Sequence, residues 1–86
     1  MSQEINKFVA QAIIENALFF EFSGEKIIDP DAAIQALEQM AATLQMADTE
    51  TKASLCLHFK NIAMQYSGEK ADFVASLDDA LGLFDA

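Results

Sequence analysis

The chain has 86 residues, of which 52% are hydrophobic, and its formal net charge is −9 because 14 acidic residues face five lysines and no arginine. Nucleic-acid-binding surfaces and basic amphipathic membrane anchors need clustered positive charge, so this composition excludes both. The length predicts one small domain, residues 1–86. So large an apolar fraction exceeds what a thin core can hide, which predicts a contact with a second chain.

The sequence carries few signals of compartment or of membrane association. The first four residues contain no basic segment typical of a secretory signal, and no apolar run approaches the ~20 residues of a membrane span. Cys56 is the single cysteine, so the chain cannot form an internal disulfide. We expect a cytoplasmic protein.

The first predicted helix covers residues 3–22 and is apolar on almost every side. Its main stripe at 100° per residue consists of Ile5, Phe8, Val9, Ala12, Ile13, Phe19 and Phe20. A second row contains Ile14, Leu18 and Phe22, and we expect it to be available to a partner. Asn16 falls inside the main stripe, where an amide either sets the register of an interface or bonds water at the stripe edge. Gly24 fits a left-handed helix end.

The second predicted helix covers residues 30–46. Asp29 supplies an N-cap, Pro30 the first helical position and Asp31 a carboxylate in the first turn. Its stripe consists of Ala33, Leu37, Met40 and Leu44. The many alanines favour close approach between helices.

The third predicted helix covers residues 49–66, with Asp48 as its N-cap and Gly68 as a left-handed end. The predicted core stripe is Leu55, Phe59, Ile62 and Tyr66. Leu57 and Met64 lie on the far side, as a second apolar ridge.

The fourth predicted helix covers residues 69–84 and carries the stripe Phe73, Leu77, Ala80 and Phe84. Asp72, Asp78 and Asp79 occupy its flanks. Short connections between four helices predict an all-α fold, a small antiparallel four-helix bundle made of two helix-turn-helix units.

A five-residue segment supports two such units, because Phe22-Ser23-Gly24-Glu25-Lys26 recurs as Tyr66-Ser67-Gly68-Glu69-Lys70. The alignment places Leu18 and Phe22 opposite the stripe residues Ile62 and Tyr66, which favours a core position for both. Internal duplication and a shared helix stop arisen by chance both explain the repeat. Two units are fewer than solenoid proteins need.

The residues that could carry chemistry are few. His58 and Cys56 are two positions apart on one helix, so their side chains point about 200° apart and cannot act as a base and nucleophile. One histidine and one cysteine do not make a zinc site, and the isolated glycines Gly24 and Gly68 form no phosphate-binding loop. We therefore predict no enzyme activity, no cofactor and no metal.

These observations favour a non-catalytic protein-interaction module that is acidic and homodimeric. Small bacterial immunity or inhibitor proteins and secretion chaperones have this composition, and a basic protein partner would suit the charge. The predicted partner-binding residues are Ile14, Leu18, Leu57, Met64, Asp72, Asp78 and Asp79. The alternative function is a nucleic-acid mimic, or a regulator of a DNA-binding protein, in which regularly spaced carboxylates stand in for phosphates.

Overall fold

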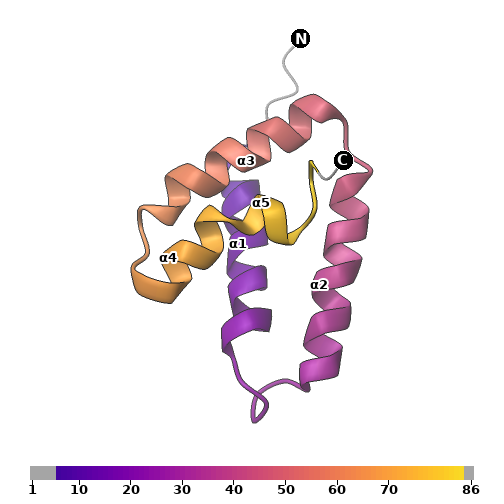
Figure 1. Ribbon diagram of the computed structural model, residues 1–86, viewed down its shortest axis with the longest axis vertical. Coiled ribbons are helices and arrows are strands. Elements are labelled where there is room, and N and C mark those ends of the chain that lie inside the picture. The colour runs from indigo at the N-terminus through magenta and orange to yellow at the C-terminus, as the bar shows by residue number, and fades with distance from the viewer. Residues whose placement is uncertain (1–5, 85–86) are drawn as a thin grey trace.

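The computed structural model describes residues 6–84, and every regular element in that range is a helix, so the all-α class is confirmed (Figure 1). The elements in chain order are α1 (Lys7–Phe22), α2 (Pro30–Gln45), α3 (Thr49–Ala63), α4 (Gly68–Ala75) and α5 (Leu77–Ala80). Residues 3–5 of the first predicted helix lie outside the described residues. None of the described helices is long and apolar enough to cross a membrane.

Side-chain caps define where the first three helices begin. Each cap oxygen accepts a hydrogen bond from a backbone N–H that the first helical turn leaves without a partner. The pairs are Asn6 with the N–H of Phe8 (2.7 Å), Asp29 with Ala32 (3.0 Å) and Asp48 with Thr51 (2.8 Å). The sequence predictions for Asp29 and Asp48 are confirmed.

The predicted end of the third helix is wrong. α3 ends at Ala63, where the N–H groups of Gln65 and Tyr66 bond the carbonyls of Ile62 (2.8 Å) and Ala63 (3.1 Å) in a tightened last turn. Gly68 has the expected positive φ of 62°, but it begins α4 rather than ending α3.

The predicted fourth helix is broken at Ser76, which has φ −108° and ψ 16°. Its hydroxyl donates to the carbonyl of Asp72 at 2.9 Å, which is a side-chain bond typical of bent helices. α5 ends at Ala80 and is followed by Gly82, whose φ is 64°; the N–H groups of Gly82 and Leu83 donate to the carbonyls of Asp79 and Asp78. These bends carry Leu83 back onto α3.

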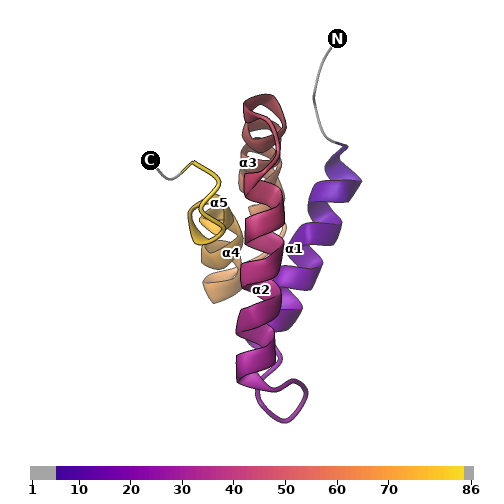
Figure 2. The same ribbon diagram turned by 90° about the vertical axis from the view of Figure 1, so that its right-hand side faces the viewer.

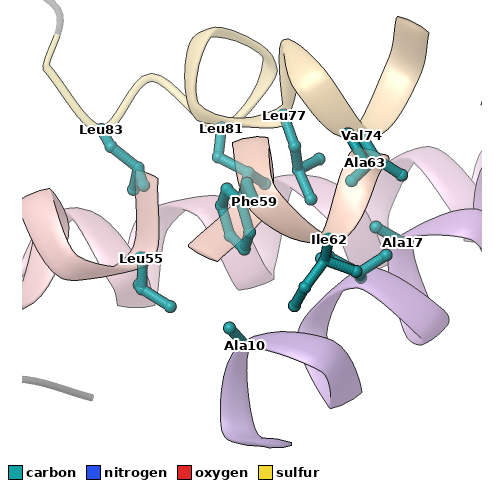
Figure 3. Close-up of a cluster of buried hydrophobic side chains, with 11 residues drawn as sticks. Ala10, Ala17, Leu55, Phe59, Ile62, Ala63, Val74, Leu77, Leu81 and Leu83 are labelled. Carbon is teal, nitrogen blue, oxygen red and sulfur yellow. The ribbon is translucent and has the colours of Figure 1, made fainter. Parts of the chain in front are cut away.

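The core is built around α3, which lies between α1 on one side and α4–α5 on the other (Figure 2). Phe59 and Leu55 of α3 are fully buried, and Figure 3 shows Leu81 beside Phe59 and Leu83 above Leu55. Completely burying such a side chain stabilises the fold by roughly 1.5–3 kcal/mol. The predicted core stripe of the third helix is therefore confirmed for Leu55, Phe59 and Ile62, whereas Tyr66 is half-buried.

The face that α1 turns toward the core is not the predicted main stripe. Its buried residues are Ala10, Ile14 and Ala17, whereas Phe8 is 66% exposed and Phe19 47% exposed. The two alanines allow α3 to approach closely, which the phenylalanines would prevent. Because both sides of α1 are apolar, its periodicity did not distinguish the core side from the outer side.

Candidate partner-binding surface

An apolar groove follows α2 along the side that faces α1, α4 and α5. Its first section, near the α1–α2 connection, has a volume of about 210 Å³, and its second, between α2 and the α4–α5 pair, about 150 Å³. Glu21 and Leu37 line both sections, so the two adjoin. We call this surface the α2 groove. Its apolar lining comprises Phe20, Ile28, Ala33, Ile34, Leu37, Ala41, Phe73, Leu77, Ala80 and Leu81.

The groove exists because α2 is attached to the rest of the chain by few large side chains. Ala33 is the buried residue of α2, and its side chain is too short to fill the space beside it. Leu37, Met40 and Leu44 are half-buried against the core. At the far end, the Gln45 side-chain amide donates to the Leu81 carbonyl at 2.8 Å and joins α2 to the C-terminal turn.

The charged residues that line the groove have one sign. Glu21, Glu25 and Glu38 are among its lining residues. Of the described residues that line it, none is a lysine, and the chain has no arginine. The arrangement therefore combines an apolar floor with carboxylates, which attract positive charge.

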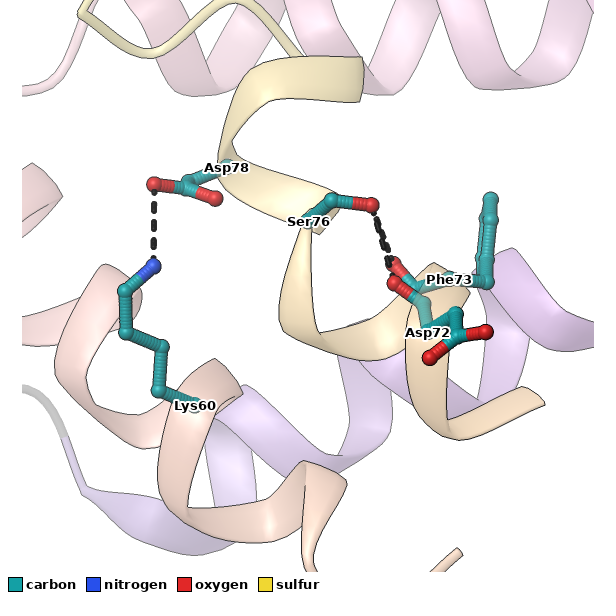
Figure 4. Close-up of polar contacts among 5 residues, drawn as sticks. All are labelled: Lys60, Asp72, Phe73, Ser76 and Asp78. Atoms are coloured by element: carbon teal, nitrogen blue, oxygen red, sulfur yellow. Dashed lines mark hydrogen bonds and ion pairs between the residues drawn. The ribbon is translucent and has the colours of Figure 1, made fainter. Parts of the chain in front are cut away.

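A second polar cluster joins α3 to α5. The Lys60 ammonium lies 3.5 Å from Oδ2 of Asp78, while Oδ1 of Asp78 is buried without a hydrogen-bond partner (Figure 4). Burial, followed by the negative charge of Asp78, raises the pKa of the Cys56 thiol. This cluster disfavours a reactive thiolate, because a negative neighbour opposes ionisation.

The three predicted acidic partner residues do not lie on one continuous helix and are not equally exposed. Asp78 has a side chain only 19% exposed and is paired with Lys60. Asp72 and Asp79 are exposed, but Ser76 interrupts the helix between them. Regular helical spacing of the carboxylates is therefore absent.

The predicted apolar partner residues separate into two groups. Ile14 is fully buried, and Leu18 is half-buried against the same core. The prediction that Ile14 is available to a partner is therefore wrong. Phe22 of that row contacts Phe73 with ring centroids 5.7 Å apart. Leu57 and Met64 are 65% and 80% exposed and remain available on α3 and just beyond it. His58 is half-buried.

Sequence reasoning missed two surfaces. The first is the α1 outer face, which we define as Phe8, Val9, Ala12, Asn16 and Phe19; all five are exposed. The second is the α2 groove, because no local pattern shows how far apart α2 and α5 lie. The sequence did carry a signal for the first surface, because α1 is apolar on both sides. In a small domain one side of such a helix faces the core, and the other is left exposed unless a second chain covers it.

Comparison with known proteins gives no match: no protein-family model matches the chain, and no curated protein or solved structure matches it at a significant level. Within residues 6–84, no group of three or more His, Cys, Asp or Glu side chains is placed to hold a metal ion.

Proposed function

We propose that this chain is a non-catalytic, acidic protein-interaction module. The observation that carries the proposal is the combination of exposed large apolar side chains on α1, α2 and α3 with a net charge of −9. Exposed apolar residues that gather on one face are typical of protein contacts. The charge selects partners of opposite sign by steering their approach.

The partner class that fits this surface is a basic protein. Small immunity or inhibitor proteins and secretion chaperones provide the closest functional analogy, and the analogy rests on composition. Capture from a native lysate at two salt concentrations tests the proposal. We expect basic proteins to be retained at low salt and released as ionic strength rises, because screening weakens contacts between exposed charges. Capture of no protein above a resin control at either salt concentration would contradict it.

We also propose that two copies associate through the α1 outer face. None of the five residues that define that face is ionisable; the Lys7 ammonium lies 5.3 Å from the centroid of the Phe8 ring, and Glu15 borders the face. Two copies of charge −9 therefore meet there with less repulsion than at the more acidic surfaces. The Asn16 amide donates to the Ala12 carbonyl at 2.8 Å, and its oxygen can accept a bond from a partner helix. Dimers with two-fold symmetry are the commonest soluble homo-oligomers.

Light scattering measures this association directly. We expect a mass twice the 9.4 kDa of the chain at tens of micromolar. The Phe19→Glu variant should give the single-chain mass, because it places a carboxylate in the uncharged face. A single-chain mass for the unmodified protein would contradict the dimer but leave binding of another protein open.

The alternative function, a nucleic-acid mimic or regulator of a DNA-binding protein, has weaker support. It requires evenly spaced carboxylates on one helix, whereas Asp78 is paired and the helix is interrupted at Ser76. If the partner recovered is a DNA-binding protein that duplex DNA displaces, this alternative replaces the first.

A further inference from the structure

We propose that the α2 groove binds a basic amphipathic helix of the partner protein, with apolar side chains in the groove and lysine or arginine side chains against its glutamates. The inference rests on the proposed function and specifies where and what the module binds. It is carried by the apolar lining of the groove together with the single sign of the charges beside it.

The shape of the groove favours a row of side chains over a small compact ligand. The two sections, of about 210 and 150 Å³, adjoin along α2. Their α2 lining runs from Pro30 to Ala41, so the groove extends along roughly three helical turns. A helix that presents apolar residues at i, i+3, i+4 and i+7 would place successive side chains in successive sections.

The positions of the glutamates determine the polar part of the ligand. Glu21 lines both sections, Glu25 lines the first and Glu38 the second, so negative charge accompanies the groove over its length. None of these three carboxylates has an ion-pair partner among the described residues. Basic residues flanking the apolar row of the ligand would meet all three.

A second copy of the chain does not fit this groove. Its helices carry acidic residues beside their apolar rows, and no arginine. Insertion of α1, α2, α4 or α5 would place carboxylates against Glu21, Glu25 and Glu38, which is unfavourable for like charges. α3 differs, with Lys52 and Lys60 beside Glu50, but Lys60 is already paired with Asp78 and the incoming copy as a whole carries a charge of −9. The occupant is therefore a different polypeptide, and the groove is distinct from the α1 outer face.

A titration with designed helical peptides tests the inference on the full chain. The probe is an alanine-based peptide of about 18 residues, long enough to be helical in isolation, with leucine at i, i+3, i+4 and i+7 and lysines only at positions that flank the leucine row. A second peptide replaces every lysine with glutamate. We expect saturable calorimetric binding of the lysine peptide and none of the glutamate peptide.

Two matched alanine variants test the apolar part. Ala80 and Ala75 are both exposed and are the last residues of α5 and α4, but only Ala80 lines the groove. We expect Ala80→Gln to weaken binding of the lysine peptide about tenfold, because a polar side chain then occupies the groove. Ala75→Gln should leave the affinity unchanged, and equal melting temperatures would show that both variants are folded.

Two double variants test the charges. Glu21→Gln with Glu38→Gln removes two groove carboxylates, whereas Glu15→Gln with Asp72→Asn removes two exposed ones elsewhere. Both change the net charge equally. We expect the groove pair to weaken binding about fivefold, as two exposed ion pairs do, and the control pair to weaken it less than about twofold.

Absence of binding to the unmodified chain, or equal effects within either matched pair, would overturn the groove assignment. Lysate capture separates that failure from failure of the proposed function. If Ala80→Gln captures the same partner as the unmodified protein, the module stands and its binding site lies elsewhere. If the unmodified chain neither binds the peptide nor captures a partner, both proposals fail.

Discussion

The segments Phe22–Lys26 and Tyr66–Lys70 share four of five residues, yet they connect their helices in different ways. The first follows the end of α1, and a further turn separates it from α2, which begins at Pro30. The second leads directly into α4, whose first residue is Gly68. In both segments the glycine has a positive φ, 79° at Gly24 and 62° at Gly68.

The residues that follow each segment explain the difference. Pro30 fixes the first turn of α2 and disfavours helical backbone at Asp29, so the helix cannot begin earlier. After Gly68 no proline intervenes before Ser76, and the helix starts at once. The repeated segment therefore sets the conformation of a glycine, while its neighbours set the helix boundary.

The two connections lead to two kinds of packing. The short one places α4, and α5 after it, against α3, and Val74 and Leu77 are fully buried there. The longer one leaves α2 attached by half-buried side chains, with the α2 groove beside it. We call α3–α4 the closed hairpin and α1–α2 the open hairpin. The closed hairpin contributes stability, whereas the open one leaves a surface for binding.

The largest expected difference between the two hairpins is in the loss of stability when a large apolar side chain is replaced by alanine. Phe59→Ala on α3 should lower the free energy of unfolding by about 3–5 kcal/mol, because the side chain is fully buried. Leu37→Ala on α2 should cost only roughly 1–2 kcal/mol, because that side chain is half-buried beside the groove. Denaturant unfolding of both variants measures this, and equal costs would show that α2 is as tightly packed as α3.

The glycines should give a smaller and more equal effect. Gly24→Ala and Gly68→Ala should each cost about 1–2 kcal/mol, because alanine is strained at positive φ. A Cβ at either position would meet no atom within 4 Å, so the cost comes from the backbone alone. Ser67→Ala is the control, since that side chain makes no cap bond and its loss should be nearly neutral. A neutral Gly68→Ala would contradict the left-handed start of α4.

The smallest expected effect is on the reactivity of the Cys56 thiol, which lies on α3 in the closed hairpin. Because burial and then Asp78 raise its pKa, the thiolate fraction at pH 8 is lower than for a free cysteine. Asp78→Asn removes one cause, lowers the pKa and should speed alkylation by roughly two- to fivefold. Asp72→Asn should not change the rate. An alkylation rate unaffected by Asp78→Asn would exclude the electrostatic contribution.

Features set by local chemistry could be predicted from the sequence. Asp29 and Asp48 cap helices through bonds to residues three positions later, and Leu55, Phe59 and Ile62 recur at the spacing of one helix face. Features set by distant contacts could not. The break at Ser76 accompanies the burial of Leu83 against α3, which no short segment encodes.

The binding surfaces were the least predictable part. Both sides of α1 are apolar, so periodicity could not show that Ala10 and Ala17 face α3 while Phe8 and Phe19 face outward. The α2 groove depends on the spacing between α2 and α5, which lie far apart in the chain. Its charge could be expected from composition, but its location could not.

Chemical-shift mapping of the lysine peptide on the isotope-labelled full chain tests the central claim most directly. We predict that the largest amide shift changes occur at Ala33, Leu37 and Ala80, which line the groove, and that they diminish as salt is raised. Largest changes on the α1 outer face, or no changes at saturating peptide, would contradict the claim that the α2 groove is the binding surface.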